Sequence, residues 1–158
     1  MKKFLGIHPL QKVYAHCDIP CGIYDPHQAQ VAALTVIRMT DLILELEDAS
    51  GTVPTHNISR YTAVKEKHAE LCKEEVRIIW GDYMKTEQLD EHEELNEIVH
   101  RIMQLASEAR QRVEREVGVE LLGAVNRFAE IFWETKGVKT KKVKAPYKPG
   151  EEIVYPEL

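Results

Sequence analysis

Apolar residues recur at the helical period over most of the chain, and this pattern limits the fold more than any other feature of the sequence. Between Asp25 and Lys136, apolar residues stand three or four positions apart, which places them along one side of a helix. Strand-like alternation is almost absent. Four such stretches joined by brief connections predict an all-α fold, an antiparallel up-down four-helix bundle.

The four predicted helices have different start and end signals. The first follows Asp25-Pro26-His27-Gln28, where Asp25 can cap, Pro26 suits the first helical position and Gln28 can close a capping box. It ends near Asp48, and a loop over 50–54 follows. The second is expected over about residues 58–84. The apolar stripes of the last two are Leu95, Ile98, Val99, Ile102, Leu105 and Ala106, and Leu121, Leu122, Val125, Phe128 and Phe132.

Length and composition fit one soluble domain. The chain has 158 residues, of which 44% are hydrophobic and 30% charged. No apolar run approaches the roughly eighteen residues of a membrane span, and the net charge of −5 argues against general nucleic-acid binding. We therefore expect neither a membrane nor a nucleic acid as partner.

The first fifteen residues, MKKFLGIHPLQKVYA, imitate an export signal, but their apolar patch covers only Phe4 to Ile7. A secretory signal needs an apolar region of about 7–15 residues. We interpret residues 1–15 as a pro-segment removed by a processing peptidase. The cytoplasm is then the expected location.

The C-terminal end differs in composition from the helical part. Six lysines and no acid stand between Lys136 and Lys148. The favoured interpretation of residues 137–158 is a solvated, mobile tail. The alternative is an arm that docks on a neighbouring subunit through Ile153, Val154 and Tyr155.

The segment HCDIPCGIYDP, residues 16–26, carries the chemistry. It holds two thiols and an imidazole in a stretch that suits neither helix nor strand and can curl so that both sulfurs meet one ion. Such donors suit zinc, copper and nickel, and square-planar nitrogen and sulfur donation favours nickel(II) or copper(II). Spacing alone leaves open a flexible leader with an incidental disulfide or weakly bound zinc. Cys72 lies in a helical pattern and is expected to be a small buried apolar residue.

This segment resembles the metal hook of the nickel superoxide dismutase family, His-Cys-x-x-Pro-Cys-Gly-x-Tyr at the mature N-terminus. The similarity continues through VKEKHAEL at 64–71, WGDYMK at 80–85 and IFWETK at 131–136, in the family's order. It covers residues 16 to about 136. The resemblance implies an enzyme that converts superoxide to dioxygen and hydrogen peroxide by Ni(II)/Ni(III) cycling, with one nickel ion per subunit of a homohexamer.

The resemblance also implies roles for single residues. Cleavage before His16 would free its α-amine, which binds nickel together with the Cys17 amide nitrogen, the sulfurs of Cys17 and Cys21, and the His16 imidazole. By the same resemblance, Pro20 and Gly22 shape the hook, which comprises residues 16–24. Tyr24 and Asp18 line the approach to the metal. Lys85 attracts the superoxide anion.

The chain departs from the family at two positions. In the family, a glutamate and an arginine hold the axial imidazole ligand, which corresponds to that of His16. The matching positions in this chain are Ala32 and His68. Groups that hydrogen-bond to a ligating imidazole fix its orientation and basicity. His68 can take over this role directly or through water, or it can be a core histidine with a local partner. The alternative function is a nickel or copper carrier or sensor without catalysis, which needs no accessible oxidised state.

Overall fold

The computed structural model describes residues 22–46 and 49–158. Within these ranges the chain forms α1 (His27–Leu44), α2 (Thr52–Ile78), a π-helical turn (Ile79–Tyr83), α3 (Thr86–Glu91), α4 (Leu95–Gln111) and α5 (Arg115–Glu134). Two strands follow, β1 (Thr140–Lys144) and β2 (Glu152–Pro156). The fold is therefore mostly helical, as predicted, but it adds a small sheet that the sequence analysis did not expect.

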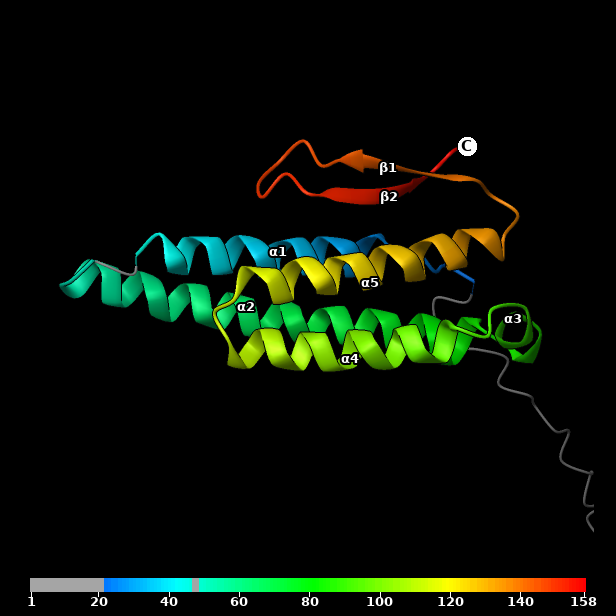
Figure 1. Ribbon diagram of the computed structural model, residues 1–158, viewed down its shortest axis with the longest axis horizontal. Helices are drawn as coiled ribbons and strands as arrows, with labels where there is room; N and C mark the ends of the chain where they lie inside the picture. The colour runs from blue at the N-terminus through cyan, green and yellow to red at the C-terminus, as the bar shows by residue number, and fades with distance from the viewer. Residues whose placement is uncertain (1–21, 47–48) are drawn as a thin grey trace, which may run out of the picture.

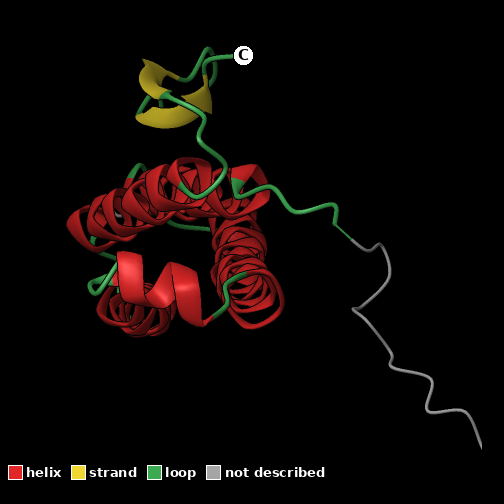
Figure 2. Cartoon of the chain, turned by 90° about the vertical axis from the view of Figure 1, so that its right-hand side faces the viewer, coloured by secondary structure: helices red, strands yellow, loops and turns green. Residues whose placement is uncertain are grey.

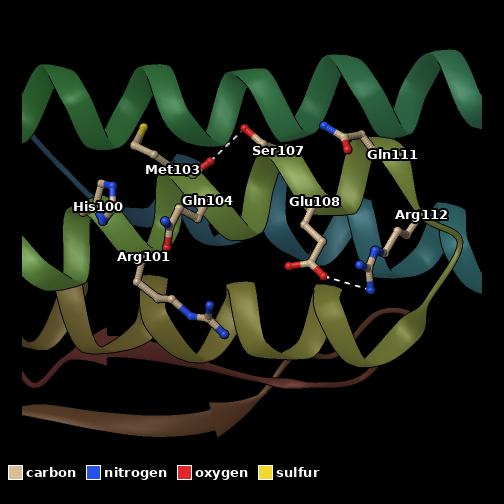
Figure 3. Close-up of a pocket in the computed structure, with 8 residues that line it drawn as sticks. All are labelled: His100, Arg101, Met103, Gln104, Ser107, Glu108, Gln111 and Arg112. Atoms are coloured by element: carbon tan, nitrogen blue, oxygen red, sulfur yellow. Dashed lines mark hydrogen bonds and ion pairs between the residues drawn. The ribbon is translucent and has the colours of Figure 1, made fainter.

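The four long helices lie alongside one another (Figure 1). Helix α1 packs on α2 and α5, and α4 packs on the same two helices from the other side. The view along the helices in Figure 2 shows them around a common centre. The apolar stripes meet there, and the largest fully buried apolar side chains of the helical part are Phe128, Phe132, Leu34, Ile37, Ile79, Leu95, Ile102, Leu105, Leu121 and Ile131. No helix in the described ranges combines the length and hydropathy needed to cross a membrane.

The contact between α1 and α5 is close because Gly118 has no side chain. A Cβ atom built on Gly118 would lie 2.9 Å from Cγ1 of Ile37, well inside normal contact. The sequence pattern leaves the break between the last two predicted helices somewhere between Ala106 and Leu121. In the structure the break lies between the end of α4 at Gln111 and the start of α5 at Arg115, and Gly118 is helical.

The helix starts differ from the predicted signals. The Asp25 carboxylate accepts the backbone N–H of His27 (2.8 Å), but Pro26 stands at the cap position and no side chain caps α1 there. Gln28 closes no capping box; in the orientation that satisfies its amide, its nitrogen donates to the Glu75 carboxylate (2.7 Å). Helix α2 begins at Thr52, earlier than predicted. Pro54 does not prevent this, because it falls in the first turn, where a missing N–H costs nothing.

The lysine-rich C-terminal end is a β-hairpin, so the expectation of a solvated tail is wrong. Strands β1 and β2 pair antiparallel, with Lys142 opposite Val154. The Gln30 side chain on α1 donates to the Val154 carbonyl (3.1 Å) and accepts the Val154 N–H (2.6 Å). Ile153 and Val154 are both fully buried within their own subunit. The hairpin thus belongs to the core that α1 and α5 form.

Candidate metal centre

The predicted ligands His16, Cys17 and Cys21, with Asp18 and Pro20, lie outside the described residues. The described chain begins at Gly22, whose φ of +81° is a conformation that glycine adopts without strain. Across residues 22–46 and 49–158, no three His, Cys, Asp or Glu side chains form a group that could hold a metal ion. The predicted ligands in residues 16–21 precede Gly22 directly in the sequence, so Gly22 to Tyr24 connect them to the described fold.

Cys72 is fully buried on α2, as the sequence analysis predicted. Burial raises the pKa of its thiol from 9.0 to about 12, and the nearby Glu75 carboxylate adds to the rise. The thiolate is the form that binds metals, so this side chain is unsuited to the task. Only Cys17 and Cys21 remain as thiol donors, because the chain has three cysteines.

Tyr24 leads from the hook segment onto an aromatic cluster formed by Tyr24, Tyr83, Phe132 and Trp133. The Tyr24 ring centre lies 5.7 Å from that of Tyr83, and the Tyr83 ring lies 5.0 Å from Phe132. Phe132 and Trp133 meet edge to face at 5.1 Å. Such tilted and edge-to-face contacts are the favourable arrangements of aromatic rings. The cluster therefore fixes the position of the Tyr24 ring against the helices.

The Tyr83 hydroxyl belongs to a short chain of hydrogen bonds. It lies 2.8 Å from the Thr135 hydroxyl, which itself donates to the Phe132 carbonyl (2.7 Å). Because the Thr135 proton is used on that carbonyl, Tyr83 must be the donor to Thr135. The Lys136 ammonium lies 4.6 Å from the Tyr83 ring centre, a cation–π contact. Tyr83 is thus held at its ring by Phe132 of α5 and at its hydroxyl by Thr135, directly after α5.

The π-helical turn explains why Tyr83 faces this cluster. The N–H of Met84 bonds to the carbonyl of Ile79 (3.1 Å), five residues earlier, so the turn contains one more residue than a regular α-helical turn. Ile79 and Met84 are both buried, whereas Tyr83 is half-buried. Met84 takes the core position that a regular helix would give to Tyr83. Turns of this kind are frequent at functional sites.

Lys85 follows directly after this turn. Its side chain is exposed, and its ammonium donates to the Asp82 carbonyl (2.6 Å). Its backbone N–H donates to the Gln88 side chain (2.9 Å), which starts α3. A positive charge is thereby placed two residues from Tyr83, at the same end of the helices as Tyr24.

The two positions at which the chain departs from the family lie on neighbouring helices. Ala32 is buried in the core face of α1. His68 is half-buried on α2, and its Nδ1 lies 2.8 Å from the Val64 carbonyl. That contact requires a proton on Nδ1, so Nε2 of the neutral ring is an acceptor. The local partner agrees with one of the two interpretations of His68; any contact with His16 lies outside the described residues.

Sequence reasoning gave no role to Tyr83, Phe132, Thr135 or Lys136. These residues lie in two of the segments that carried the resemblance, WGDYMK and IFWETK. Phe132 entered the sequence analysis only as part of an apolar stripe, and Tyr83 only as a residue of the second predicted helix. The signal that could have found them is the convergence of two aromatic segments, which begin at residues 80 and 131, on the end of the fold that holds Tyr24.

The family model for nickel-containing superoxide dismutase matches residues 11–136. This chain belongs to the nickel-containing superoxide dismutase family. It is 35% identical over 128 residues to "Superoxide dismutase [Ni]" of Streptomyces coelicolor, covering 81% of this chain and 93% of the relative. The protein of the same name from Streptomyces seoulensis is 34% identical over the same shares. The predictions of a superoxide dismutase and of a nickel cofactor are confirmed.

Solved structures of nickel superoxide dismutase have the same fold. The native structure matches with a TM-score of 0.69 and 34% identity, covering 77% of this chain and 99% of that chain. The apo structure matches with a TM-score of 0.66 and 30% identity, covering 73% and 99%. The family match ends at Lys136, so β1 and β2 lie beyond it.

Proposed function

We propose that this member of the nickel superoxide dismutase family converts superoxide to dioxygen and hydrogen peroxide at a site built on the segment from His16 to Tyr24. The observation that carries this proposal is the family match, which runs through the whole HCDIPCGIY segment and through the residues that hold Tyr24 in place. The four long helices would form the antiparallel up-down bundle predicted from the sequence.

The donors available to nickel fit the metal. Cys17 and Cys21 supply two thiols, His16 supplies an imidazole, and cleavage before His16 would add a primary amine. Soft sulfur and imidazole nitrogen donors are suited to late first-row metals such as nickel. Bound nickel would supply the one-electron acceptor and donor that dismutation needs.

The remaining residues would position and supply this site. Pro20 and Gly22 would shape the hook, and Asp18 and Tyr24 would line the approach. Tyr24 is held against Tyr83, whose proton is committed to Thr135. Of these two hydroxyls, that of Tyr24 would therefore be the one to give a proton to reduced superoxide. The exposed ammonium of Lys85 would attract the anion locally, which matters because the chain as a whole is negative.

Processing and assembly complete the proposal. An amide-bonded His16 nitrogen is a much poorer donor than a free amine, so residues 1–15 would block metal assembly until a peptidase removes them. The family match begins at residue 11 and so includes part of this segment. On the resemblance to the family, we also propose a homohexamer.

Nickel dependence tests the function directly. Purified chain beginning at His16 is expected to remove superoxide in proportion to its nickel content, up to one ion per chain. Metal-free protein and protein loaded with zinc, which does not change oxidation state, should show only background decay. A zinc-loaded sample as active as the nickel-loaded one would contradict a nickel dismutase, and nickel binding without activity would favour the carrier.

The substitution His68→Ala tests the altered partner of the axial imidazole. We expect it to lower turnover several-fold while nickel content stays within about a third of wild type, because loss of an outer partner disturbs a ligand more than it removes one. Gln in place of His68 keeps an amide that can bond to an imidazole and should restore part of the turnover. Unchanged turnover in His68→Ala would leave His68 as a core residue bonded to Val64.

A further inference from the structure

Strand β2 of the C-terminal hairpin is bound by side chains of both α1 and α5. Gln30 from α1 holds the backbone of Val154, and Asn126 from α5 donates to the Glu152 carbonyl (2.8 Å). Successive strand residues point to opposite faces, yet Ile153 and Val154 are both buried. Strand β2 is therefore covered on both faces, and β1 is the outer strand, as Figure 1 shows.

The register determines which backbone groups of β1 face away from β2. The N–H and C=O of Val154 are used by Gln30, so its partner Lys142 forms a non-hydrogen-bonded pair with it. The N–H and C=O of Lys142 must then point to the outer edge. By alternation, the same holds for Thr140 and Lys144. The pairs beyond the strand ends agree, since Ala145 donates to Glu151 (3.0 Å) and Glu157 to Lys139 (2.8 Å).

This outer edge of β1 is open and positively charged. Its outward backbone groups make no hydrogen bond to any other element of the described chain. Lysines stand at 139, 141, 142, 144 and 148, and no acid lies between 135 and 150. Of these, only Lys142 forms an ion pair within the described residues, with Glu130 (2.9 Å). Lys141 and Lys144 are exposed.

The charge decides which strand could join this edge. Pairing of β1 with β1 of a second copy would bring lysines opposite lysines, which is unfavourable. The first 21 residues of the chain are no better suited, because they contain Lys2, Lys3 and Lys12 but only one acid, Asp18. An extended segment with acidic side chains would gain both backbone hydrogen bonds and charge pairs.

We propose that the outer edge of β1 binds an extended acidic segment of a partner protein, which adds as a third strand through the backbone groups of Thr140, Lys142 and Lys144. This interaction surface lies outside the part of the chain shared with the family and requires no nickel. It would connect the enzyme to a partner without using the residues around Tyr24.

A labelled peptide in which glutamate alternates with valine tests the proposal on the full chain at low salt. Fluorescence anisotropy should show binding of this peptide and none of its lysine–valine counterpart. Lys144→Pro removes an outward N–H that the hairpin does not use and should weaken binding at least about fivefold. Lys144→Gln is the matched control, which removes the same charge but keeps the N–H, and should cost only about two- to threefold.

Amide hydrogen exchange provides a measurement that needs no variant. In the free protein the N–H groups of Lys142 and Lys144 should exchange faster than those of Lys141 and Val143, which bond to β2. The peptide should slow exchange at Lys142 and Lys144. The proposal is overturned if the peptide does not bind, or if both Lys144 variants weaken it equally and exchange is unchanged. It is also overturned if a single-stranded oligonucleotide of equal charge binds as tightly, which would indicate general attraction of polyanions.

Discussion

Replacing either Cys17 or Cys21 with serine is expected to reduce nickel binding to background and to abolish superoxide dismutation. A serine hydroxyl remains protonated near neutral pH and is a hard donor, whereas the thiolate is the soft, charged donor that suits nickel. Loss of one sulfur also removes one of the two thiolate charges that would make the oxidised state of bound nickel accessible. Metal content by mass spectrometry and superoxide decay on the same samples would measure both effects.

Cys72 supplies the matched control. It is fully buried, and its thiol pKa is raised to about 12, so it carries no thiolate at neutral pH. Cys72→Ala should therefore keep nickel content and turnover at the wild-type level, with a loss of stability of about 1 kcal/mol from the small cavity. Equal loss of nickel in the variants at 17, 21 and 72 would mean that the thiols act through folding. Normal nickel content after loss of Cys17 or Cys21 would refute the ligand assignment.

Phe132→Ala is expected to produce one of the largest losses of stability in the helical part, about 3–5 kcal/mol. Phe132 is fully buried on α5 and contacts the rings of both Tyr83 and Trp133. Its removal leaves a cavity under Tyr83, so turnover of the folded, nickel-loaded protein should fall as well. Urea unfolding measures the first effect, and superoxide decay well below the melting temperature measures the second.

Phe128→Ala separates the two effects of this prediction. Phe128 lies one turn earlier on α5 and is equally buried, but it takes no part in the aromatic cluster around Tyr83. It should cost similar stability and leave turnover unchanged. An equal fall of turnover in both variants would show that the cluster has no specific part in the site. A loss below about 1 kcal/mol for Phe132→Ala would contradict the packing described above.

The long helices were predictable because their core contacts repeat at the helical period along the sequence. Their boundaries were less so. Pro54 suggested a loop, yet a proline in the first turn is compatible with helix. Helix α3 was missed because none of its six residues is buried, so the sequence there shows no apolar periodicity from which a helix could be predicted.

The hairpin could not be predicted from local pattern. Strand β1 is largely exposed along its length and so shows no alternation of apolar and polar residues. Strand β2 is joined to α1 by the Gln30 side chain, 124 positions away in the sequence, and no local rule connects the two. The composition of the lysine-rich segment favoured solvation, and a long-range contact overrode it.

The site was predictable only in part. Residue types and order in HCDIPCGIY predicted the metal ligands and the family, but the support around Tyr24 depends on the extra residue between Ile79 and Met84. A regular helix through this region would have placed Tyr83 in the core. The aromatic cluster thus follows from one irregular turn that periodicity does not reveal.

The most direct test of the central claim is superoxide decay, followed by pulse radiolysis, with nickel-loaded protein that begins at His16 and with an otherwise identical chain that begins at Ala15. The account predicts fast decay with the first and little with the second, because only the first has a free amine at His16. Equal rates from the two chains would contradict the requirement for cleavage. No decay above background from either chain, with nickel bound to both, would contradict the proposed activity itself.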